Sequence, residues 1–441
     1  MKRLFLQIDN APLIVFRIFL GFLLACETFG AILTGWVKDN LVTPQFTFSH
    51  IGMEWLQPLP GNGMYFYFAA MGILGLLIMI GYKYRWSMAL FTLMWTAVYL
   101  MQKTSYNNHY YLLILVCLIM LLLPAHRYAS VDVRLNPSIK KLTMPAWCSW
   151  IMILQVTIVY FYATLAKFYP DWLDGTFTRD LLARSVTSPA LHEIMTQKWF
   201  YLFIAYAGIA FDMLVVPLLL YKRTRTVALI ASVIFHIFNS ITLQIGIFPF
   251  FALSFVVFFY PPEKIRKLFL RRKPTTEEAG QPTIEGRNVL RYFFIPYFII
   301  QILLPLRHYL VKGDVLWTEE AHRLSWRMML RSRGGDTDFT IIDKKTGKRL
   351  HYNLSQKLTH KQVNGMNTKP DMIWQMAQRI KKEFAAGGKD VAIYAHTSVS
   401  INGRPYQRLI DPNVDLGSVE WDYFWHCDWI LLPDDKGNSL P

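Results

Sequence analysis

Seven polar side chains stand at the edges of strongly apolar stretches of this sequence or inside them, and they are its first candidates for chemistry. They are Asn107, Asn108, His109, Lys167, His236, Asn239 and Gln244. Amines, imidazoles and amides in an apolar setting can move a proton or hold a small polar group, and the exclusion of water strengthens both actions. These side chains would form a polar site if the fold brings them together.

Lys167 has the most specific chemistry of the seven. Burial away from carboxylates disfavours the charged form of a lysine, so the free amine can act as a general base. Asp171, close by in the chain, would oppose that role if it pointed at the amine. Structural alternatives exist, because Lys167 can snorkel to lipid headgroups, His109 can be an interfacial histidine and His236 can pack against a neighbouring helix. The histidines lack close ligand spacing, so no metal site is predicted.

The elements that must position these residues are predicted to be membrane helices. Apolar residues make up 53% of the 441 residues and charged residues only 17%, against roughly 25% charged residues in soluble proteins. Helices are the only open-chain structure that satisfies backbone hydrogen bonds in lipid. The prediction is a polytopic α-helical membrane protein with about nine transmembrane helices, the eighth being short enough to be re-entrant. The apolar blocks are about 11–36, 62–82, 86–102, 110–125, 147–167, 199–221, 226–246, 247–260 and 288–309.

Lysine and arginine are distributed unevenly between the two sides that nine spans would create. The N-terminus and the linkers after blocks two, four, six and eight hold nineteen of them, whereas the opposite short loops hold five. The positive-inside rule then places the N-terminus in the cytoplasm and the chain after block nine outside. The net charge of +16 is thus a topology signal, and no nucleic-acid partner is predicted. The same topology spreads the seven candidates from mid-depth to the outer membrane surface.

Three charged residues lie within the apolar blocks. Arg17 and Glu27 belong to the first block and Asp212 to the sixth. Charges at such depth normally face the bundle interior or a watery cavity. Asp212 could therefore serve as a structural partner for Arg17.

The chain after block nine is polar enough to form a small extracytoplasmic α+β domain. We predict that residues 1–309 form the transmembrane bundle with the site and that residues 310–441 form this second domain. Its alternating and helical patterns predict a hairpin, a helix and two further strands. These elements are expected at 323–330 with 338–353, at 370–385 and within 391–410.

Five separated strings of the sequence resemble a single family. They are KTSYNNHYYL at 103–112, HRYASVD at 126–132, VYFYATLAKFYPDWLDG at 159–175, FHIFNSITLQIGIF at 235–248 and SINGRPYQRLIDPNVDL at 400–416. They resemble the vitamin K-dependent gamma-glutamyl carboxylase and its bacterial relatives with the horizontally transferred transmembrane (HTTM) domain. The strings run from the third helix into the outer domain, so the resemblance covers most of the chain.

The resemblance implies an enzyme that couples two reactions. Lys167 aligns with the family's general base, which deprotonates reduced vitamin K, a naphthohydroquinone. The quinol reacts with O2 to give an epoxide by way of a strongly basic oxyanion, which takes a γ-proton from a peptidyl glutamate so that the carbanion captures CO2. Asn108 and His109 fall on the family's Asn-His pair, and His236 on a third polar position. We predict catalytic roles for Lys167, His109 and Asn108, and cofactor binding by His236, Asn239, Asn107 and Gln244.

The implied partners are the lipid bilayer and a protein or peptide glutamate that approaches from outside, with the chain in a bacterial inner membrane. Arg404, Gln407 and Arg408 could grip an acidic peptide or could be solvated surface. The chain ends soon after DWILLP at 428–433, earlier than the animal enzyme, which leaves propeptide recognition in doubt. Two alternatives stay open: quinol epoxidation with another acceptor or none, and a non-catalytic transporter or scaffold. The sequence does not predict the oligomeric state.

Overall fold

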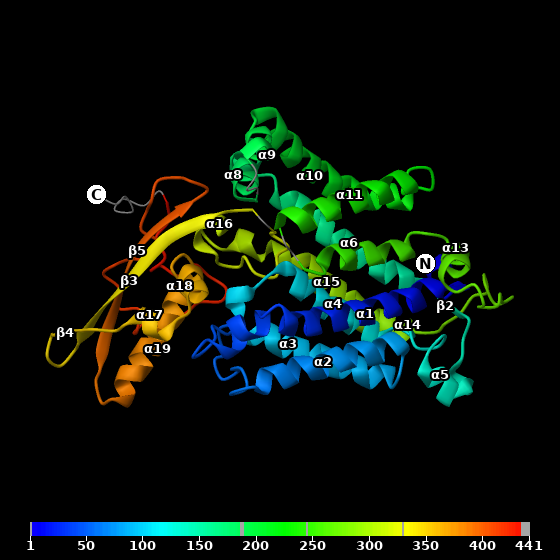
Figure 1. The fold of residues 1–441 in the computed structure, drawn as a ribbon, viewed down its shortest axis with the longest axis horizontal. Coiled ribbons are helices and arrows are strands. Elements are labelled where there is room, and N and C mark those ends of the chain that lie inside the picture. Colours follow the sequence, from blue (N-terminus) through cyan, green and yellow to red (C-terminus); the bar gives the residue numbers. More distant parts are fainter. Residues whose placement is uncertain (1, 186–188, 244–245, 329, 434–441) are drawn as a thin grey trace.

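Each of the nine apolar blocks contains helix in the computed structural model, which describes residues 2–185, 189–243, 246–328 and 330–433 (Figure 1). Most of these helices run along the long axis of the molecule. They are α1 (Ala11–Leu33), α2 (Gly63–Ile80), α3 (Tyr84–Met101), α4 (Asn108–Leu122), α6 (Trp147–Ala166), α10 (Lys198–Leu220), α11 (Arg225–Leu243), α12 (Phe248–Ser254) with η5 (Phe255–Phe258), and the continuous segment α14 (Arg287–Val289), η6 (Leu290–Phe294), α15 (Ile295–Leu303) and η7 (Leu304–Leu310).

Five of these segments are long and apolar enough to cross a membrane, namely α1, α2, α6, α10 and Arg287–Leu310. The chain is therefore a mostly helical protein with five candidate spans, and nine spans stay a prediction. Three further apolar helices are shorter: Asn108–Leu122, Arg225–Ile241 and Phe248–Phe258. The helix Asn108–Leu122 is short because the side chain of Asn107 caps its start and Pro124 follows its end. Fifteen residues give only about 22 Å of helix.

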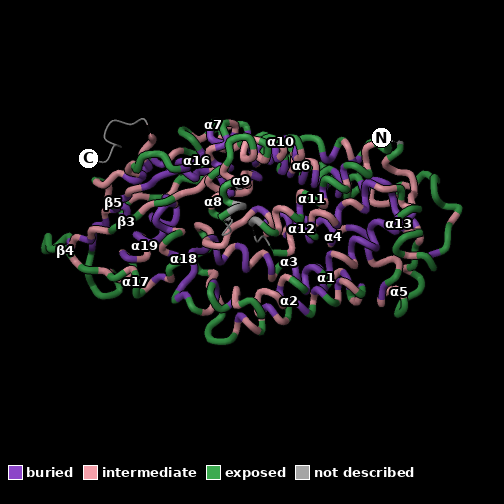
Figure 2. Tube along the Cα trace, turned by 45° about the horizontal axis from the view of Figure 1, so that its top comes forward, coloured by how far each residue is buried: buried purple, intermediate pink, exposed green. Residues whose placement is uncertain are grey.

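Close packing of α1 on α2 builds one wall of the bundle. A Cβ added to Gly21 would lie 2.3 Å from the backbone nitrogen of Met79, and one added to Gly75 would lie 2.7 Å from that of Ala25. Small residues let helix backbones approach in this way in membrane bundles. Buried residues concentrate along α1, whereas α2 and α10 keep exposed apolar faces (Figure 2). Exposed apolar faces of this kind suit contact with lipid.

Arg17 lies fully buried in α1, and the predicted pairing with Asp212 is wrong. Its guanidinium donates to the backbone carbonyl oxygens of Ala125 (3.0 Å), Tyr128 (3.3 Å) and Ala129 (2.6 Å). The five donors of an arginine suit a turn whose carbonyl groups would otherwise be unpaired. The loop after α4 thus takes the partner role that sequence reasoning gave to a carboxylate.

The two ends of the bundle differ in what covers them. The N-terminus, the two-stranded pairing of β1 (Gln7–Asp9) with β2 (Thr143–Pro145), and α13 (Pro262–Phe269) lie at one end (Figure 1). Basic side chains at this end form ion pairs with carboxylates, for example Lys273 with Asp9 at 2.5 Å and Lys141 with Glu285 at 3.0 Å. The C-terminal α+β part covers the opposite end. The uneven charge of the loops therefore corresponds to two ends of the structure.

The C-terminal part packs a helix against a three-stranded antiparallel sheet of order β4-β3-β5. Its strands are β3 (Arg333–Asp343), β4 (Arg349–Leu350) and β5 (Val391–Ile401), and the helix is α19 (Pro370–Ala386). Phe46 and Phe48, from the loop between α1 and α2, join its apolar core. The remaining elements are α5 (Val131–Leu135), α7 (Pro170–Leu173), α8 (Thr176–Ser185), α9 (Pro189–Met195), α16 (Val315–Thr318), α17 (Leu354–Lys357), α18 (His360–Met366), η1 (Lys2–Phe5), η2 (Lys38–Val42), η3 (Lys103–Ser105) and η4 (Pro137–Ile139).

Two details of the predicted α+β elements need correction. The hairpin forms at the Lys-Thr-Gly turn between β3 and β4, but the described residues of 323–330, namely 323–328 and 330, are irregular instead of a strand. Leu324 and Trp326 have φ of 62° and 58° there, which is incompatible with extended chain. After β5 the described chain makes two isolated bridges, Gln407 with Val399 and Ile410 with Ile430, in place of the second predicted strand. The helix predicted at 370–385 is confirmed.

Candidate active site

Four of the seven candidate residues line one cavity. It has a volume of about 200 Å³, and its walls come from α4, α6, α7, α8, α10, α11 and α12. The four are His109, Lys167, His236 and Asn239. Most of the remaining wall is aliphatic or aromatic, with the rings of Phe211 and Phe235 stacked 3.9 Å apart beside it. Apolar walls with a few convergent polar groups are the usual form of a small-molecule site.

Lys167 is paired with a carboxylate, contrary to the predicted setting. Its Nζ contacts Oδ2 of Asp212, and both side chains are largely buried. The ammonium also lies 5.3 Å from the ring centre of Trp172, within range of a cation–π contact. Asp171, the residue expected to oppose a base, turns away to the side chains of Asn402 and Arg404. Asp212 is therefore the group that can exchange a proton with the lysine.

The two histidines of the cavity are held differently. His236 is 3% exposed, and its Nε2 lies 3.2 Å from the hydroxyl of Tyr160. Its Nδ1 is buried without a hydrogen-bond partner among the described residues. His109 stacks on Phe248 with ring centres 3.7 Å apart. His236 thus has a polar atom to offer a ligand, and His109 forms part of a flat aromatic wall.

The two asparagines beside His109 do not line the cavity. The side chain of Asn107 accepts a hydrogen bond from the backbone N–H of Tyr110 at 2.8 Å and so begins α4. Asn108 donates to the carbonyl oxygen of Arg327 at 3.2 Å, which fastens the segment carrying Met328 over the cavity. Both asparagines therefore hold the surrounding backbone. The prediction for Gln244 falls outside the described residues.

Glu27, in α1, supports the part of the cavity wall that carries His109. Its carboxylate accepts a hydrogen bond from the hydroxyl of Tyr110 at 2.9 Å, one residue after His109. This contact joins α1 to the first turn of α4. The buried charge that the sequence places in the first block thus helps to fix the position of His109.

Three polar side chains of the cavity are not among the seven candidates predicted from the sequence. Asp212 was noticed as a buried charge but was given the wrong partner. Tyr160 lies inside the string VYFYATLAKF, where nothing separates it from ordinary aromatic packing residues. Thr178 belongs to α8, outside every apolar block, yet it is 2% exposed and its Oγ1 lacks a partner among the described residues. No signal in a single sequence marks such a threonine.

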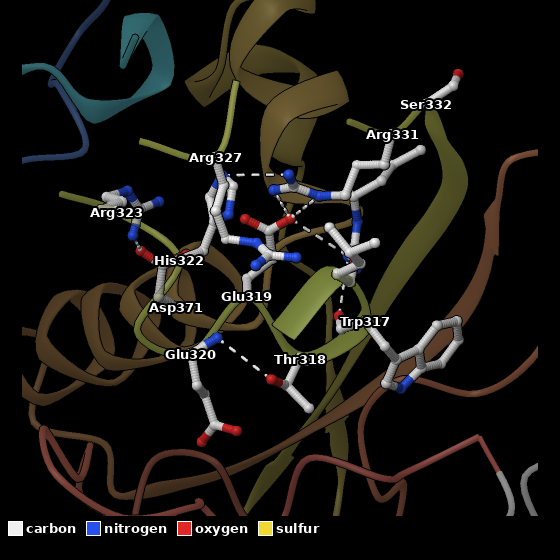
Figure 3. A network of polar contacts seen from close by, with 12 residues as sticks. Trp317, Thr318, Glu319, Glu320, His322, Arg323, Arg327, Arg331, Ser332 and Asp371 are labelled. Carbon is white, nitrogen blue, oxygen red and sulfur yellow. Dashed lines mark hydrogen bonds and ion pairs between the residues drawn. The ribbon is translucent and has the colours of Figure 1, made fainter. Parts of the chain in front are cut away.

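The C-terminal part holds a buried ionic network that reaches the end of the bundle (Figure 3). The carboxylate of Glu319 accepts hydrogen bonds from Nε of Arg331 at 2.6 Å and from Arg333 at 3.3 Å. The carboxylate of Asp371 forms ion pairs with Lys103 at 2.5 Å and Arg323 at 2.7 Å. We call these residues the interface network. Because Lys103 lies between α3 and α4 and Asp371 lies in α19, the network fastens the C-terminal part to the end of the bundle.

The cations of the interface network dominate its electrostatics. Burial alone would raise the pKa of Asp371, but Arg323 and Lys103 outweigh burial and hold that pKa below its ordinary value. The pKa of Glu319 is likewise lowered, because Arg331, His322 and Arg333 outweigh its burial. Both carboxylates are therefore ionised at neutral pH.

A second cavity, of about 420 Å³, adjoins the turn that follows Lys167. Tyr169 and Asp171 line it from the bundle side, and Arg327, Arg404 and Gln407 line it from the C-terminal part. The charge of Arg404 is already matched by Asp171. Arg327 carries a buried Nε without a partner among the described residues. It is thus a better candidate for an anionic ligand than the exposed arginine predicted from the sequence.

Whether the first cavity fits a reduced naphthoquinone depends on the atoms that line it. Such a ligand is flat and apolar, with two oxygens that need polar partners. The cavity offers aromatic faces together with the unpaired Nδ1 of His236 and Oγ1 of Thr178, besides the Lys167–Asp212 pair. A buried polar atom without a partner costs free energy unless a ligand or water supplies one. The donor set therefore fits the quinol.

Comparison with known families matches two regions that together cover most of the chain. Residues 5–263 match the model of the HTTM domain, and residues 286–436 match that of the vitamin K-dependent gamma-carboxylase lumenal domain. No solved structure matches the chain. The two matched regions meet at the interface network and at the second cavity, and the first contains all seven candidate residues. The chain therefore belongs to the HTTM family and is a carboxylase-like integral membrane protein that carries the lumenal domain of the vitamin K-dependent gamma-carboxylases.

Proposed function

We propose that the chain is a vitamin K-dependent gamma-carboxylase-like enzyme that couples oxygenation of a reduced naphthoquinone to carboxylation of protein glutamate. The observation that carries the proposal is the buried Lys167–Asp212 pair facing an aromatic cavity with unpaired polar atoms. The basic end of the bundle supports a cytoplasmic N-terminus, which leaves the C-terminal part and both cavities toward the outer side.

Lys167 and Asp212 act together in this proposal. An ammonium held on a carboxylate cannot accept a proton, so Nζ must first release one. Oδ2 of Asp212 is the contacting group that can take it, and the apolar walls favour a neutral pair over a charged one. The free amine of Lys167 then accepts a proton from the quinol hydroxyl.

The other cavity residues hold and orient the quinol. Nδ1 of His236 and Oγ1 of Thr178 can each pair with a quinol oxygen, and Asn239 lies one helical turn from His236 on the same wall. His109 and Phe248 supply a flat face for the ring system. The bound, deprotonated quinol supplies, with O2, the strong base needed at a glutamate γ-carbon. Exclusion of water by the aromatic walls protects such a base.

The second cavity is the proposed entrance for the peptide. It opens on the C-terminal part and borders the Lys167–Trp172 turn, so an extended glutamate side chain can approach the first cavity from there. The unpaired Nε of Arg327 can bond to the glutamate carboxylate. Tyr169 lies at the boundary, with its hydroxyl bonded to the carbonyl oxygen of Leu330.

The test is a quinol epoxidation assay on the full chain in lipid nanodiscs, with reduced vitamin K, O2, labelled bicarbonate and a glutamyl peptide. We expect epoxide and incorporated label from the unsubstituted chain. Lys167→Met should lose about 100-fold or more of the epoxide rate. Lys198→Met is the matched control, because this lysine is exposed at the start of α10 and should keep full activity.

The assay also separates the alternatives. Epoxide without label would support a quinol-epoxidising enzyme that acts on another acceptor or on none. That reading has one structural observation behind it, because the exposed Arg404 is already paired with Asp171. If the folded chain makes no epoxide from any naphthoquinol tried, the enzymatic proposal is wrong and a non-catalytic role takes its place.

A further inference from the structure

Three consecutive aromatic residues are exposed on a loop of the C-terminal part. Tyr423, Phe424 and Trp425 are 58%, 77% and 67% exposed. We call them the aromatic loop. Single exposed apolar residues need no explanation, but a contiguous group of large rings on the surface of an extramembrane domain marks a contact surface.

The aromatic loop is held in shape by its neighbours. The side chain of Asp422 accepts hydrogen bonds from the backbone N–H groups of Phe424 (2.8 Å) and Trp425 (2.9 Å). On the other side, buried Glu320 binds His426 at 2.6 Å and the backbone N–H of Cys427 at 2.8 Å. The rings are therefore presented outward by a fixed turn.

The position of the aromatic loop identifies what it contacts. The loop shares a surface hollow with Arg307 and Leu310, which belong to the last turns of the membrane-crossing segment Arg287–Leu310. Tyr309 and Leu310 are themselves more than 70% exposed at that end. The rings thus lie at the level where this segment leaves the apolar part of the bilayer.

A second loop extends the same surface. The hydroxyl of Tyr423 lies against Gly52, 3.3 Å from where a Cβ would stand. The loop that follows Gly52 exposes Trp55 by 76% and Leu59 by 49% before α2 begins. Tryptophan and tyrosine favour the headgroup region of a bilayer, because one part of each ring system is apolar and another part is polar.

We propose that the aromatic loop inserts into the interfacial layer of the bilayer that the bundle spans, and so anchors the C-terminal part to the membrane surface. The surface is continuous with the exposed end of Arg287–Leu310, which makes lipid the occupant. This anchor is independent of the proposed chemistry. It would hold the C-terminal part against the end of the bundle even when the contacts of the interface network are weakened.

The test measures how lipid quenches Trp425 in the full chain, in nanodiscs that hold one copy each. The contribution of this tryptophan is the difference in fluorescence between the unsubstituted chain and Trp425→Phe, a conservative change at an exposed site. Nanodiscs made with lipids brominated near the headgroup should remove most of that difference signal. The signal of Trp374, obtained in the same way with Trp374→Phe, should persist, because this residue packs against Trp421 within the C-terminal part.

Two results would overturn the proposal. A Trp425 signal that brominated lipid leaves as strong as that of Trp374 would show that the loop faces water. Quenching in one-copy nanodiscs that is lost in nanodiscs holding two copies would show that the loop docks on a second copy of the chain instead of lipid. Neither result depends on whether the chain makes epoxide.

Discussion

Two buried ionic sites in this molecule use the same residue types in opposite ways. In the interface network each carboxylate lies between two cationic side chains, and the contact of Lys103 with Asp371 joins the bundle to the C-terminal part. In the cavity a single lysine meets a single aspartate, and the pair faces open space lined by aromatic rings. The first arrangement fixes charges permanently. The second faces a cavity with room for a ligand, and in the proposed function a proton moves between its two groups.

The largest expected effect is on stability and lies in the interface network. Asp371→Asn leaves Lys103 and Arg323 buried without their shared carboxylate, so the free energy of unfolding should fall by about 3–5 kcal/mol. Denaturant unfolding of the chain in detergent micelles measures this, with the exposed Asp390→Asn as the control. Equal unfolding curves for the two variants would show that the network does not hold the C-terminal part in place.

Acid should act on the same contact. The pKa of Asp371 in the folded chain is below its unfolded value of about 3.9, so its stabilising contribution is complete at neutral pH. That contribution should be lost only as the pH falls below about 4. Asp371→Asn should therefore show a smaller loss of stability between pH 6 and pH 3 than the unsubstituted chain.

Asp212→Asn should have the opposite balance of effects. In the ligand-free chain the open cavity admits water to the isolated ammonium of Lys167, which also keeps its contact with Trp172, so the loss of stability should be only about 1–3 kcal/mol. The rate of quinol oxidation should fall about 100-fold, because the lysine has no partner to take its proton. A variant with normal activity would remove Asp212 from the proposed chemistry while leaving the role of Lys167 open.

The smallest expected effect concerns the aromatic loop. The hydrogen bond to Glu320 raises the pKa of His426 above its ordinary value of about 6.5. The stabilisation from this contact is therefore fully present below about pH 6.5 and is lost as the pH rises through the raised pKa. Hydrogen exchange of residues 420–430, corrected for intrinsic rates, should become up to about fivefold faster between pH 5.5 and pH 8. In His426→Gln the corrected exchange should not change with pH, and a pH-dependent variant would contradict this assignment.

Much of the architecture could be predicted from the sequence, because it depends on local patterns. The nine apolar blocks coincide with helices, and the α+β character of the C-terminal part follows from its alternating and helical periodicities. The number of spans could not be fixed in this way. Helix length depends on where caps such as Asn107 and breaks such as Pro124 fall, and several apolar helices are too short to cross a bilayer unaided.

The site could be predicted only in part. His109, Lys167, His236 and Asn239 were recognised by residue type and by resemblance, and the structure brings them to one cavity. The partner of each charge could not be predicted, because it depends on which faces of distant helices meet. Arg17 donates hydrogen bonds to carbonyl oxygens of a loop, which no sequence pattern marks. Asp212 pairs with Lys167 instead. The roles of the residues in the cavity remain predictions.

Photo-crosslinking of a naphthoquinone in the cavity would test the central claim most directly. A diazirine-bearing naphthoquinone is added to the full chain in nanodiscs and irradiated, and the adducts are mapped by mass spectrometry. We expect saturable adducts on α11 and α12 around His236 and Phe248. Excess unmodified naphthoquinone should abolish them, and Ala252→Leu, which fills the cavity, should reduce them, whereas Ala70→Leu on the exposed face of α2 should not. Saturable adducts elsewhere, with α11 and α12 unlabelled, would contradict the assignment of this cavity as the quinol site.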